Sequence, residues 1–284
     1  MVSELFTIHH SPLTKMNRID AKFQYLKEKG KRALIPFITA GDPDFETTRG
    51  LAWEFERRGA DLLELGVPFS DPLADGKTIQ RASQRALEKG ATLKRVLRLV
   101  EEVRHSCSIP LILMSYYNPI LKYGLVEFAR DARLAGLDGL IVPDLPPEEA
   151  EPLMQVNDDR GIDTIFLIAP TSPEARISLI SRLSQGYIYY VSLRGVTGAR
   201  AELASDLVPM LTKVRCHTDK PIAVGFGIST PSQARDVARY AEGVIVGSAI
   251  VNQVEKHLGK PDLVSRIGEF LAALKKGIEE DGAC

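Results

Sequence analysis

Eight short apolar runs, rich in branched residues, recur along the chain and alternate with segments that mix charged and apolar residues. Most of these runs are too uniformly apolar for strands with one solvated face, so they suit strands of a parallel sheet that helices cover. This alternation favours an α/β fold made of repeated strand and helix units. The runs span residues 33–39, 61–67, 110–116, 139–143, 163–169, 187–193, 221–227 and 243–248.

The spacing of the runs selects among α/β architectures. Successive runs start roughly 30 residues apart, the length of one strand and crossover unit. Amphipathic segments such as 45–58 and 93–105 are long enough for the crossover helices, and 261–278 is predicted as the eighth helix. Eight units without a linker predict a closed (β/α)8 TIM barrel, a single domain over residues 1–284, rather than an open doubly wound sheet.

The segment ahead of the first predicted strand divides into two parts. Residues 16–30 predict an extra helix that closes the bottom of the barrel, and residues 1–15 predict an irregular extension. The extension lacks the uninterrupted apolar stretch of a secretion signal, and no part of the chain approaches about 18 consecutive apolar residues. We therefore expect a cytoplasmic protein that does not span a membrane.

Charge and cysteine usage exclude several classes of function. The 284 residues include 36 Lys and Arg against 37 Asp and Glu, which gives a net charge of −1. Such a chain has no broad basic field for a phosphate backbone, so nucleic acid is not expected as a partner. Cys107, Cys216 and Cys284 are too widely spaced for a disulfide framework or a CxxC metal site.

The second unit carries a carboxylate inside an apolar strand. With a period of two, Leu62, Glu64 and Gly66 share one face, and the glycine suits the crowded interior of a barrel. Glu64 is therefore expected to point inward near the catalytic end. An apolar environment raises the pKa of a carboxyl group, which suits a general acid and base near neutral pH. The alternative is a buried structural Glu that bonds a neighbouring hydroxyl.

The stretch that follows this strand is longer than a simple connection requires. Long loops at the top of a barrel are usually functional. Asp75, eleven residues after Glu64, is expected to return over the mouth and face it. Two carboxylates in different surroundings can divide acid and base roles. Alternatively, Asp75 caps the helix predicted over 78–88, and for Asp71 a loop-capping role is as good an interpretation as a direct one.

Glycines gather where the last three strands end, in the segments 195–198, 225–229 and 247–248. Barrels commonly hold phosphate with backbone N–H groups from such loops and the N-terminus of a short helix. Glycine lets the backbone approach the phosphate oxygens. The pattern predicts a phosphate monoester ligand, although the glycines alternatively serve only tight turns.

The residues missing from the strand ends also discriminate between mechanisms. No Lys lies within predicted strands five to eight, so a Schiff-base aldolase lacks its nucleophile. None of the five His residues falls at a strand end, and no His and carboxylate cluster there suggests a metal. Carbon–carbon chemistry would then depend on carboxylates.

One segment carries a family resemblance. Residues 63–80, LELGVPFSDPLADGKTIQ, resemble the most distinctive signature of the tryptophan synthase alpha chain family, and the similarity continues in order over most of the chain. Further matching segments are PFITAGDP (36–43), VPDLPPEE (142–149), GVTGA (195–199), GFGIS (225–229) and VGSAIV (246–251). The resemblance implies retro-aldol cleavage of indole-3-glycerol phosphate to indole and glyceraldehyde 3-phosphate without a metal or cofactor in this chain.

The resemblance also implies roles for individual residues. Glu64 would shuttle protons, including the proton delivered to indole C3, and Asp75 would accept a hydrogen bond from the indole N–H. Thr197 would orient Asp75 when a lid closes, and Asp144 would engage the glycerol end of the substrate or the loop network. Phosphate would be bound by Gly198, Gly227, Gly247 and Ser248, and indole by Phe37, Tyr116, Ile141, Tyr189 and Phe226.

A partner follows from the same resemblance. The family pairs with a beta chain that holds pyridoxal phosphate, in an alpha2beta2 heterotetramer that passes indole internally. Arg194 and the length of the N-terminal extension depart from many members. Two alternatives stay open: another phosphosugar barrel enzyme, which would need a catalytic Lys at a strand end, and a regulatory subunit whose main task is to activate its partner.

Overall fold

The strands of the computed structural model lie where the apolar runs predict them, and every pair is parallel. The structure describes residues 17–191, 200–225 and 227–280. The strands are β1 (Ala33–Thr39), β2 (Leu63–Gly66), β3 (Leu111–Met114), β4 (Gly139–Ile141), β5 (Asp163–Ile165), β6 (Leu167–Ile168), β7 (Ile188–Val191), β8 (Ile222–Gly225) and β9 (Gly243–Val246).

The sheet closes into a barrel through the fifth apolar run. Strand β1 pairs with both β2 and β9, and the sheet continues to β5 on one side and β6 on the other. A single strand over 163–169 was the wrong prediction, because the run breaks at Phe166 into β5, which pairs with β4, and β6, which pairs with β7. Ile165 and Leu167 still face the interior while Phe166 packs outside. The bend thus redirects the backbone hydrogen bonds without changing the inward and outward alternation.

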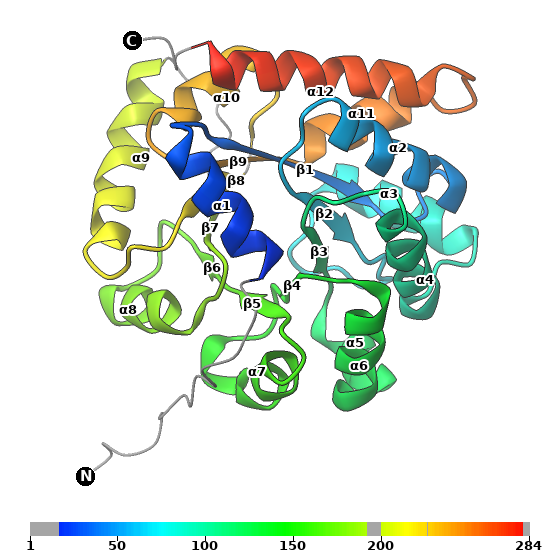
Figure 1. The fold of residues 1–284 in the computed structure, drawn as a ribbon, viewed down its shortest axis with the longest axis horizontal. Helices are drawn as coiled ribbons and strands as arrows, with labels where there is room; N and C mark the ends of the chain where they lie inside the picture. Colours follow the sequence, from blue (N-terminus) through cyan, green and yellow to red (C-terminus); the bar gives the residue numbers. More distant parts are fainter. Residues whose placement is uncertain (1–16, 192–199, 226, 281–284) are drawn as a thin grey trace.

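Helices surround the sheet, and most buried apolar side chains fill the layer between the two (Figure 1). The predicted crossover helices are confirmed within a residue or two: Asp44 caps α2 and Thr92 caps α4 with their side chains. The helices are α1 (Arg18–Glu28), α2 (Phe45–Arg57), α3 (Lys77–Glu88), α4 (Leu93–Arg104), α5 (Tyr117–Tyr123), α6 (Leu125–Ala135), α7 (Glu151–Asp158), α8 (Glu174–Leu183), α9 (Arg200–Arg215), α10 (Pro231–Ala238), α11 (Ser248–Lys256) and α12 (Leu263–Glu279), with a 3-10 turn, η1 (Pro147–Glu149).

Helix α1 closes the N-terminal end of the barrel, as the sequence predicts (Figure 1). Its buried residues Ile19, Phe23 and Leu26 join the apolar cluster inside the barrel. Gly139 leaves room for this contact, since a Cβ there would lie 2.8 Å from Ile19 Cδ1. Asn17 caps the helix and donates a hydrogen bond to the Asp138 carbonyl at 2.9 Å. The barrel interior is therefore sealed at this end, and its chemistry is confined to the other.

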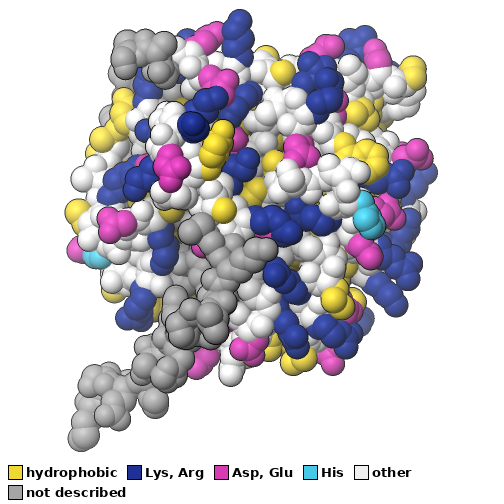
Figure 2. Space-filling model, in the orientation of Figure 1, with side chains coloured by type: hydrophobic (Ala, Val, Ile, Leu, Met, Phe, Trp, Pro, Cys, Tyr) yellow, Lys and Arg dark blue, Asp and Glu magenta, His cyan; other side chains and the backbone are white. Residues whose placement is uncertain are grey.

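The surface around this end is polar and mixed in charge. Basic and acidic side chains are interspersed over the face shown in Figure 2, in keeping with the balanced composition. Among the described residues, no helix combines the length and the apolar character needed to cross a membrane.

Candidate active site

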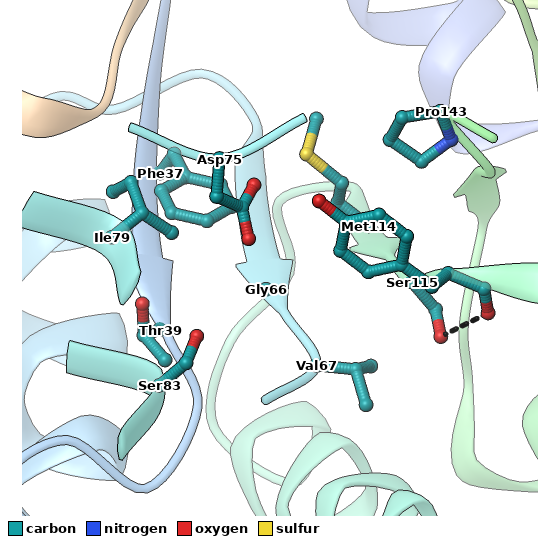
Figure 3. Close-up of a pocket in the computed structure, with 11 residues that line it drawn as sticks. Phe37, Thr39, Gly66, Val67, Asp75, Ile79, Ser83, Met114, Ser115 and Pro143 are labelled. Atoms are coloured by element: carbon teal, nitrogen blue, oxygen red, sulfur yellow. Dashed lines mark hydrogen bonds between the residues drawn. The ribbon is translucent and has the colours of Figure 1, made fainter. Parts of the chain in front are cut away.

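A pocket opens at the carboxyl ends of the first four strands, where barrel enzymes carry their chemistry (Figure 3). It holds about 280 Å³ of space that includes its open mouth. Strands β1 to β4, the loop after β2 and helix α3 supply its walls, which are mostly apolar. The lining residues are Phe37, Thr39, Gly66, Val67, Asp75, Ile79, Ser83, Met114, Ser115, Tyr116 and Pro143.

Glu64 points into the barrel, as its place in β2 predicts. Leu62 on the same face joins the interior cluster, whereas Leu63 and Leu65 pack outside against helices. The Glu64 side chain is fully buried, and the Tyr187 hydroxyl donates a 2.7 Å hydrogen bond to its Oε1. Its Oε2 is buried and has no hydrogen-bond partner among the described residues.

This environment changes the acidity of Glu64. Burial raises the pKa of the Glu64 carboxyl group to about 8, although the Tyr187 hydrogen bond acts in the opposite direction. Burial raises the pKa values of Tyr187 and Tyr189 well above the usual range, and the nearby Glu64 contributes to both shifts. The carboxyl group is therefore suited to hold a proton at neutral pH and to exchange it.

The carboxyl group of Glu64 lies one layer below the pocket floor. Glu64 pairs in register with Phe37 of β1, which lines the pocket, and precedes by two residues Gly66, which also lines it. A Cβ at Gly66 would lie 2.5 Å from Phe37 Cζ, so the glycine lets the Phe37 ring cover this part of the floor. Glu64 itself is therefore not among the residues that line the pocket, and its Oε2 has no hydrogen-bond partner among the described residues.

Asp75 reaches over the pocket from the loop between β2 and α3. Its carboxylate points toward the interior near Phe37 and Gly66 (Figure 3). Burial raises the pKa of the Asp75 carboxyl group, and a hydrogen bond with the Tyr116 hydroxyl partly offsets this. Asp75 is not the helix cap that the alternative interpretation proposed, because Gly76 occupies the N-cap position of α3 without a side-chain cap. The two carboxylates thus approach the pocket from below and from above.

The predicted indole-binding residues divide into two levels. Phe37 and Tyr116 line the pocket. Ile141 and Tyr189 lie among the apolar side chains of the barrel interior instead, and Tyr189 covers Gly225, where a Cβ would lie 2.6 Å from its hydroxyl oxygen. Phe226 falls outside the described residues.

The predicted phosphate site has one uncapped helix N-terminus. Gly247 is the N-cap of α11 and Ser248 its first residue, and no side chain accepts the helix's first N–H groups. Helix α10, by contrast, is closed by a capping box between Thr230 and Gln233. Gly227 has a φ of 76°, which favours glycine. Gly198, Thr197 and Arg194 fall outside the described residues.

Two further acidic residues at this end are engaged in loops. Asp144 Oδ1 accepts a 2.9 Å hydrogen bond from the N–H of Tyr117, the first residue of α5. Asp71 accepts a 2.5 Å hydrogen bond from Ser70 Oγ. The described part of the chain contains no group of three or more His, Cys, Asp or Glu residues that could hold a metal ion.

Several site residues were not predicted from the sequence, although regular spacings pointed to some of them. Thr39 follows Phe37 by two residues on β1, and Ser83 follows Ile79 by four residues on α3, so each pair shares one face. Tyr187 precedes Tyr189 by two residues and faces the interior with it. The other lining residues that were not predicted are Gly66, Val67, Ile79, Met114, Ser115 and Pro143.

The chain is similar to known proteins of one family over most of its length. The family model described as tryptophan synthase alpha chain matches residues 23–279. The tryptophan synthase alpha chain of Citrifermentans bemidjiense is 53% identical over 263 residues, which cover 93% of this chain and 98% of that protein. The alpha chain of Geotalea uraniireducens is 53% identical over 267 residues, covering 94% and 100% respectively.

Solved structures agree with these sequence matches. Tryptophan synthase subunit alpha from Legionella pneumophila superposes with a TM-score of 0.87 at 42% identity, covering 93% of this chain and 99% of that one. A chain of Mycobacterium tuberculosis tryptophan synthase in its aminoacrylate-bound form gives a TM-score of 0.83 at 32% identity, covering 93% and 100%. Sequence and fold therefore match over the same length.

Proposed function

The chain belongs to the tryptophan synthase alpha chain family, and we propose that Glu64 and Asp75 carry the chemistry of that family's reaction here. The enzyme is a lyase of tryptophan biosynthesis that cleaves indole-3-glycerol phosphate to indole and glyceraldehyde 3-phosphate. The alpha chain itself carries no cofactor, since pyridoxal phosphate belongs to the beta chain.

Cleavage breaks the bond between indole C3 and the first carbon of the glycerol chain. Protonated Glu64 donates its proton to C3, and the resulting carboxylate then accepts the hydroxyl proton from that first glycerol carbon as the bond breaks. The bonding electrons return to the indole ring, and the first glycerol carbon becomes the aldehyde carbon of glyceraldehyde 3-phosphate. Glu64 is again protonated. The raised pKa of about 8 is the observation that supports this cycle, because it lets one group give and take a proton near neutral pH.

Asp75 acts on the charge that protonation creates. When C3 gains a proton, the ring nitrogen becomes positive, and a carboxylate beside the N–H stabilises it. The carboxylate of Asp75 aims into the pocket from the loop, which supports this role. Thr197 orients Asp75 when the lid closes. The indole ring is held by Phe37, Tyr116 and Phe226, and Ile141 and Tyr189 form the apolar layer beneath it.

The phosphate binds at the other side of the mouth. The uncapped N-terminus of α11 supports a site there, since its free N–H groups and its dipole favour an anion. Asp144 holds the loop network near the glycerol end of the substrate. The phosphate ligands are Gly198, Gly227, Gly247 and Ser248.

The beta chain docks at the same mouth of the barrel, within an alpha2beta2 heterotetramer. This complex lies in the cytoplasm and passes indole internally. Residues 1–284 of the alpha chain form one domain. Leu73, in the loop that carries Asp75, supports this docking, because 89% of a leucine is exposed there. Leu73→Asp is expected to weaken beta-chain binding at least about tenfold in sedimentation velocity. Leu134→Asp, on the outer face of α6 where 77% is exposed, is the control. Equal binding by both variants contradicts this docking face.

Rates of indole formation test the two carboxylates, with and without a beta chain. We expect Glu64→Gln and Asp75→Asn each to lower kcat by at least about 100-fold while the unfolding midpoint stays at or above that of the wild type. A wild-type rate in either variant refutes its role. Glyceraldehyde 3-phosphate keeps its phosphate group in this reaction. The aldehyde product is therefore quantified by enzymatic oxidation.

A further inference from the structure

Helices α3 and α11 are joined by a cluster of charged side chains, which we name the Glu255 clamp: Arg81, Arg85, Glu255 and Asp42. Glu255 on α11 accepts hydrogen bonds from Arg81 Nε at 2.8 Å and Nη2 at 2.7 Å, and from Arg85 Nη1 at 2.9 Å. Arg85 also binds both carboxylate oxygens of Asp42, at 2.8 and 2.9 Å. Asp42 is only 4% exposed, so the clamp is fixed to the buried loop that follows β1.

Two further contacts support the clamp. Closer to the mouth, Thr78 Oγ1 donates a 3.2 Å hydrogen bond to Asn252 Oδ1. Beneath the polar layer, Phe37, Ala82 and Val251 form a small buried cluster that connects β1, α3 and α11. Bidentate Arg and carboxylate pairs have a defined geometry, so these contacts set both the distance and the relative orientation of the helices.

Each helix carries one end of the proposed substrate site at its N-terminus. Asp75 lies two residues before α3. Gln80 Nε2 in that helix donates a 2.8 Å hydrogen bond to the carbonyl oxygen of Asp75. Gly247 and Ser248 begin α11. The indole end and the phosphate end of one ligand thus rest on two helices that the clamp joins.

We propose that the Glu255 clamp is a positioning device that fixes the separation between the indole subsite and the phosphate subsite. This proposal rests on the proposed function. A ligand that spans both subsites gains affinity only when their separation matches its length, whereas a ligand that fills one subsite is indifferent to it. Arg81, Arg85 and Glu255 are thus positioning residues for the known reaction.

Equilibrium binding of three ligands tests the proposal. The first is an indole that carries a propyl phosphate chain at C3, which spans both subsites and cannot be cleaved. The others are indole and glycerol 3-phosphate, which each fill one subsite. We expect Glu255→Gln to raise the Kd of the spanning ligand about tenfold and leave both smaller ligands within about twofold of wild type.

Two comparisons exclude a merely structural effect. Asp262→Asn breaks a similarly short pair, Asp262 at the N-cap of α12 with Arg266 at 2.6 Å, and is expected to leave all three Kd values unchanged. Arg81 and Glu255 act as one unit. The double variant Arg81→Gln with Glu255→Gln should therefore lose about the same affinity for the spanning ligand as Glu255→Gln alone. Glu255→Asp, which keeps the charge, should recover part of the loss.

Specific results overturn the proposal. If Glu255→Gln leaves the spanning ligand unaffected, or weakens all three ligands equally, the clamp does not set the spacing. Failure of the proposed function looks different: Asp75→Asn would then bind indole as tightly as the wild type, and Ser248→Pro would bind glycerol 3-phosphate as tightly, whatever Glu255→Gln does.

Discussion

Replacing Glu64 with Gln should stabilise the protein relative to the wild type by an amount that grows as the pH rises. The carboxyl group is fully buried with one hydrogen bond, from Tyr187, and its pKa is about 8 compared with 4.5 for an unperturbed Glu. Gln has the same shape and accepts the same hydrogen bond but never ionises. The variant therefore removes the pH-dependent cost of forming a carboxylate inside the barrel, against a constant cost for the amide N–H groups that take the unpartnered place of Oε2.

The sign and size of this effect follow from proton linkage. Below about pH 4 both folded and unfolded states hold the proton, so ionisation contributes nothing. As the pH rises through 4.5 the unfolded state releases its proton while the folded state keeps it, and the free energy of unfolding falls until the pH passes about 8. With about 1.36 kcal/mol for each pKa unit, the loss between about pH 5 and about pH 9 is about 4 kcal/mol.

Urea unfolding at about pH 5, 7 and 9 measures this directly. The wild type should lose about 4 kcal/mol relative to Glu64→Gln over that range. Burial also raises the pKa of Asp163 to about 8, but Asp163 is present in both proteins, so its contribution cancels in the difference. Glu101→Gln on the exposed side of α4 is the control and should follow the wild type. A difference between wild type and Glu64→Gln that does not change with pH refutes the reasoning.

Three other perturbations give distinct readouts. Gly66→Ala places a Cβ 2.5 Å from Phe37 Cζ and pushes that ring into the pocket, so KM for indole-3-glycerol phosphate should rise about tenfold with little change in unfolding; an unchanged KM contradicts this. Arg104→Gln removes one of the two arginines that bind the 1% exposed Asp138 at 2.7 Å, the other being Arg18, together with the hydrogen bonds from Arg104 to backbone carbonyls; it should cost about 3 kcal/mol in urea unfolding, and a loss below about 1 kcal/mol contradicts it. Asp75→Asn should lower kcat without shifting the alkaline limb of the pH–rate profile, because that limb belongs to another group; a shifted limb argues against separate roles.

The barrel itself could be predicted because its signal is local and repeated. Uniformly apolar runs at regular spacing identified each strand, and β1 was predicted to the residue. The break at Phe166 was not predicted, because the run stays apolar throughout. Its cause is nonlocal: the two halves bond to different neighbours, β4 and β7, and no periodicity within the run reports that.

The candidate site was predictable in part for the same reason. The period of two placed Glu64 inside the barrel, and its apolar neighbours gave the direction of its pKa shift. Tyr187, which bonds Glu64 from 123 residues away, was beyond any pattern in the sequence. The depth of Glu64 below the pocket also depends on the packing of Phe37 over Gly66, which only the three-dimensional arrangement determines.

Asp75 illustrates a different limit. Sequence reasoning left its two interpretations balanced, since an Asp two residues ahead of a helix is often a cap. The structure separates them, because Gly76 occupies the cap position and the carboxylate turns to the pocket. Arg81, Arg85 and Glu255 occupy ordinary surface positions of helices, and the two arginines precede Glu255 by about 170 residues. Nothing in the sequence indicated that these three side chains interact.

The central claim is that Glu64 moves a proton to and from indole C3, and exchange of that proton with solvent isolates the step from bond cleavage. Indole is incubated with the enzyme in heavy water with glycerol 3-phosphate present, and loss of the C3 proton signal is followed by NMR. The wild type is predicted to catalyse the exchange, and Glu64→Gln to reduce it at least about 100-fold at equal indole binding. Exchange at the wild-type rate in Glu64→Gln would contradict the account.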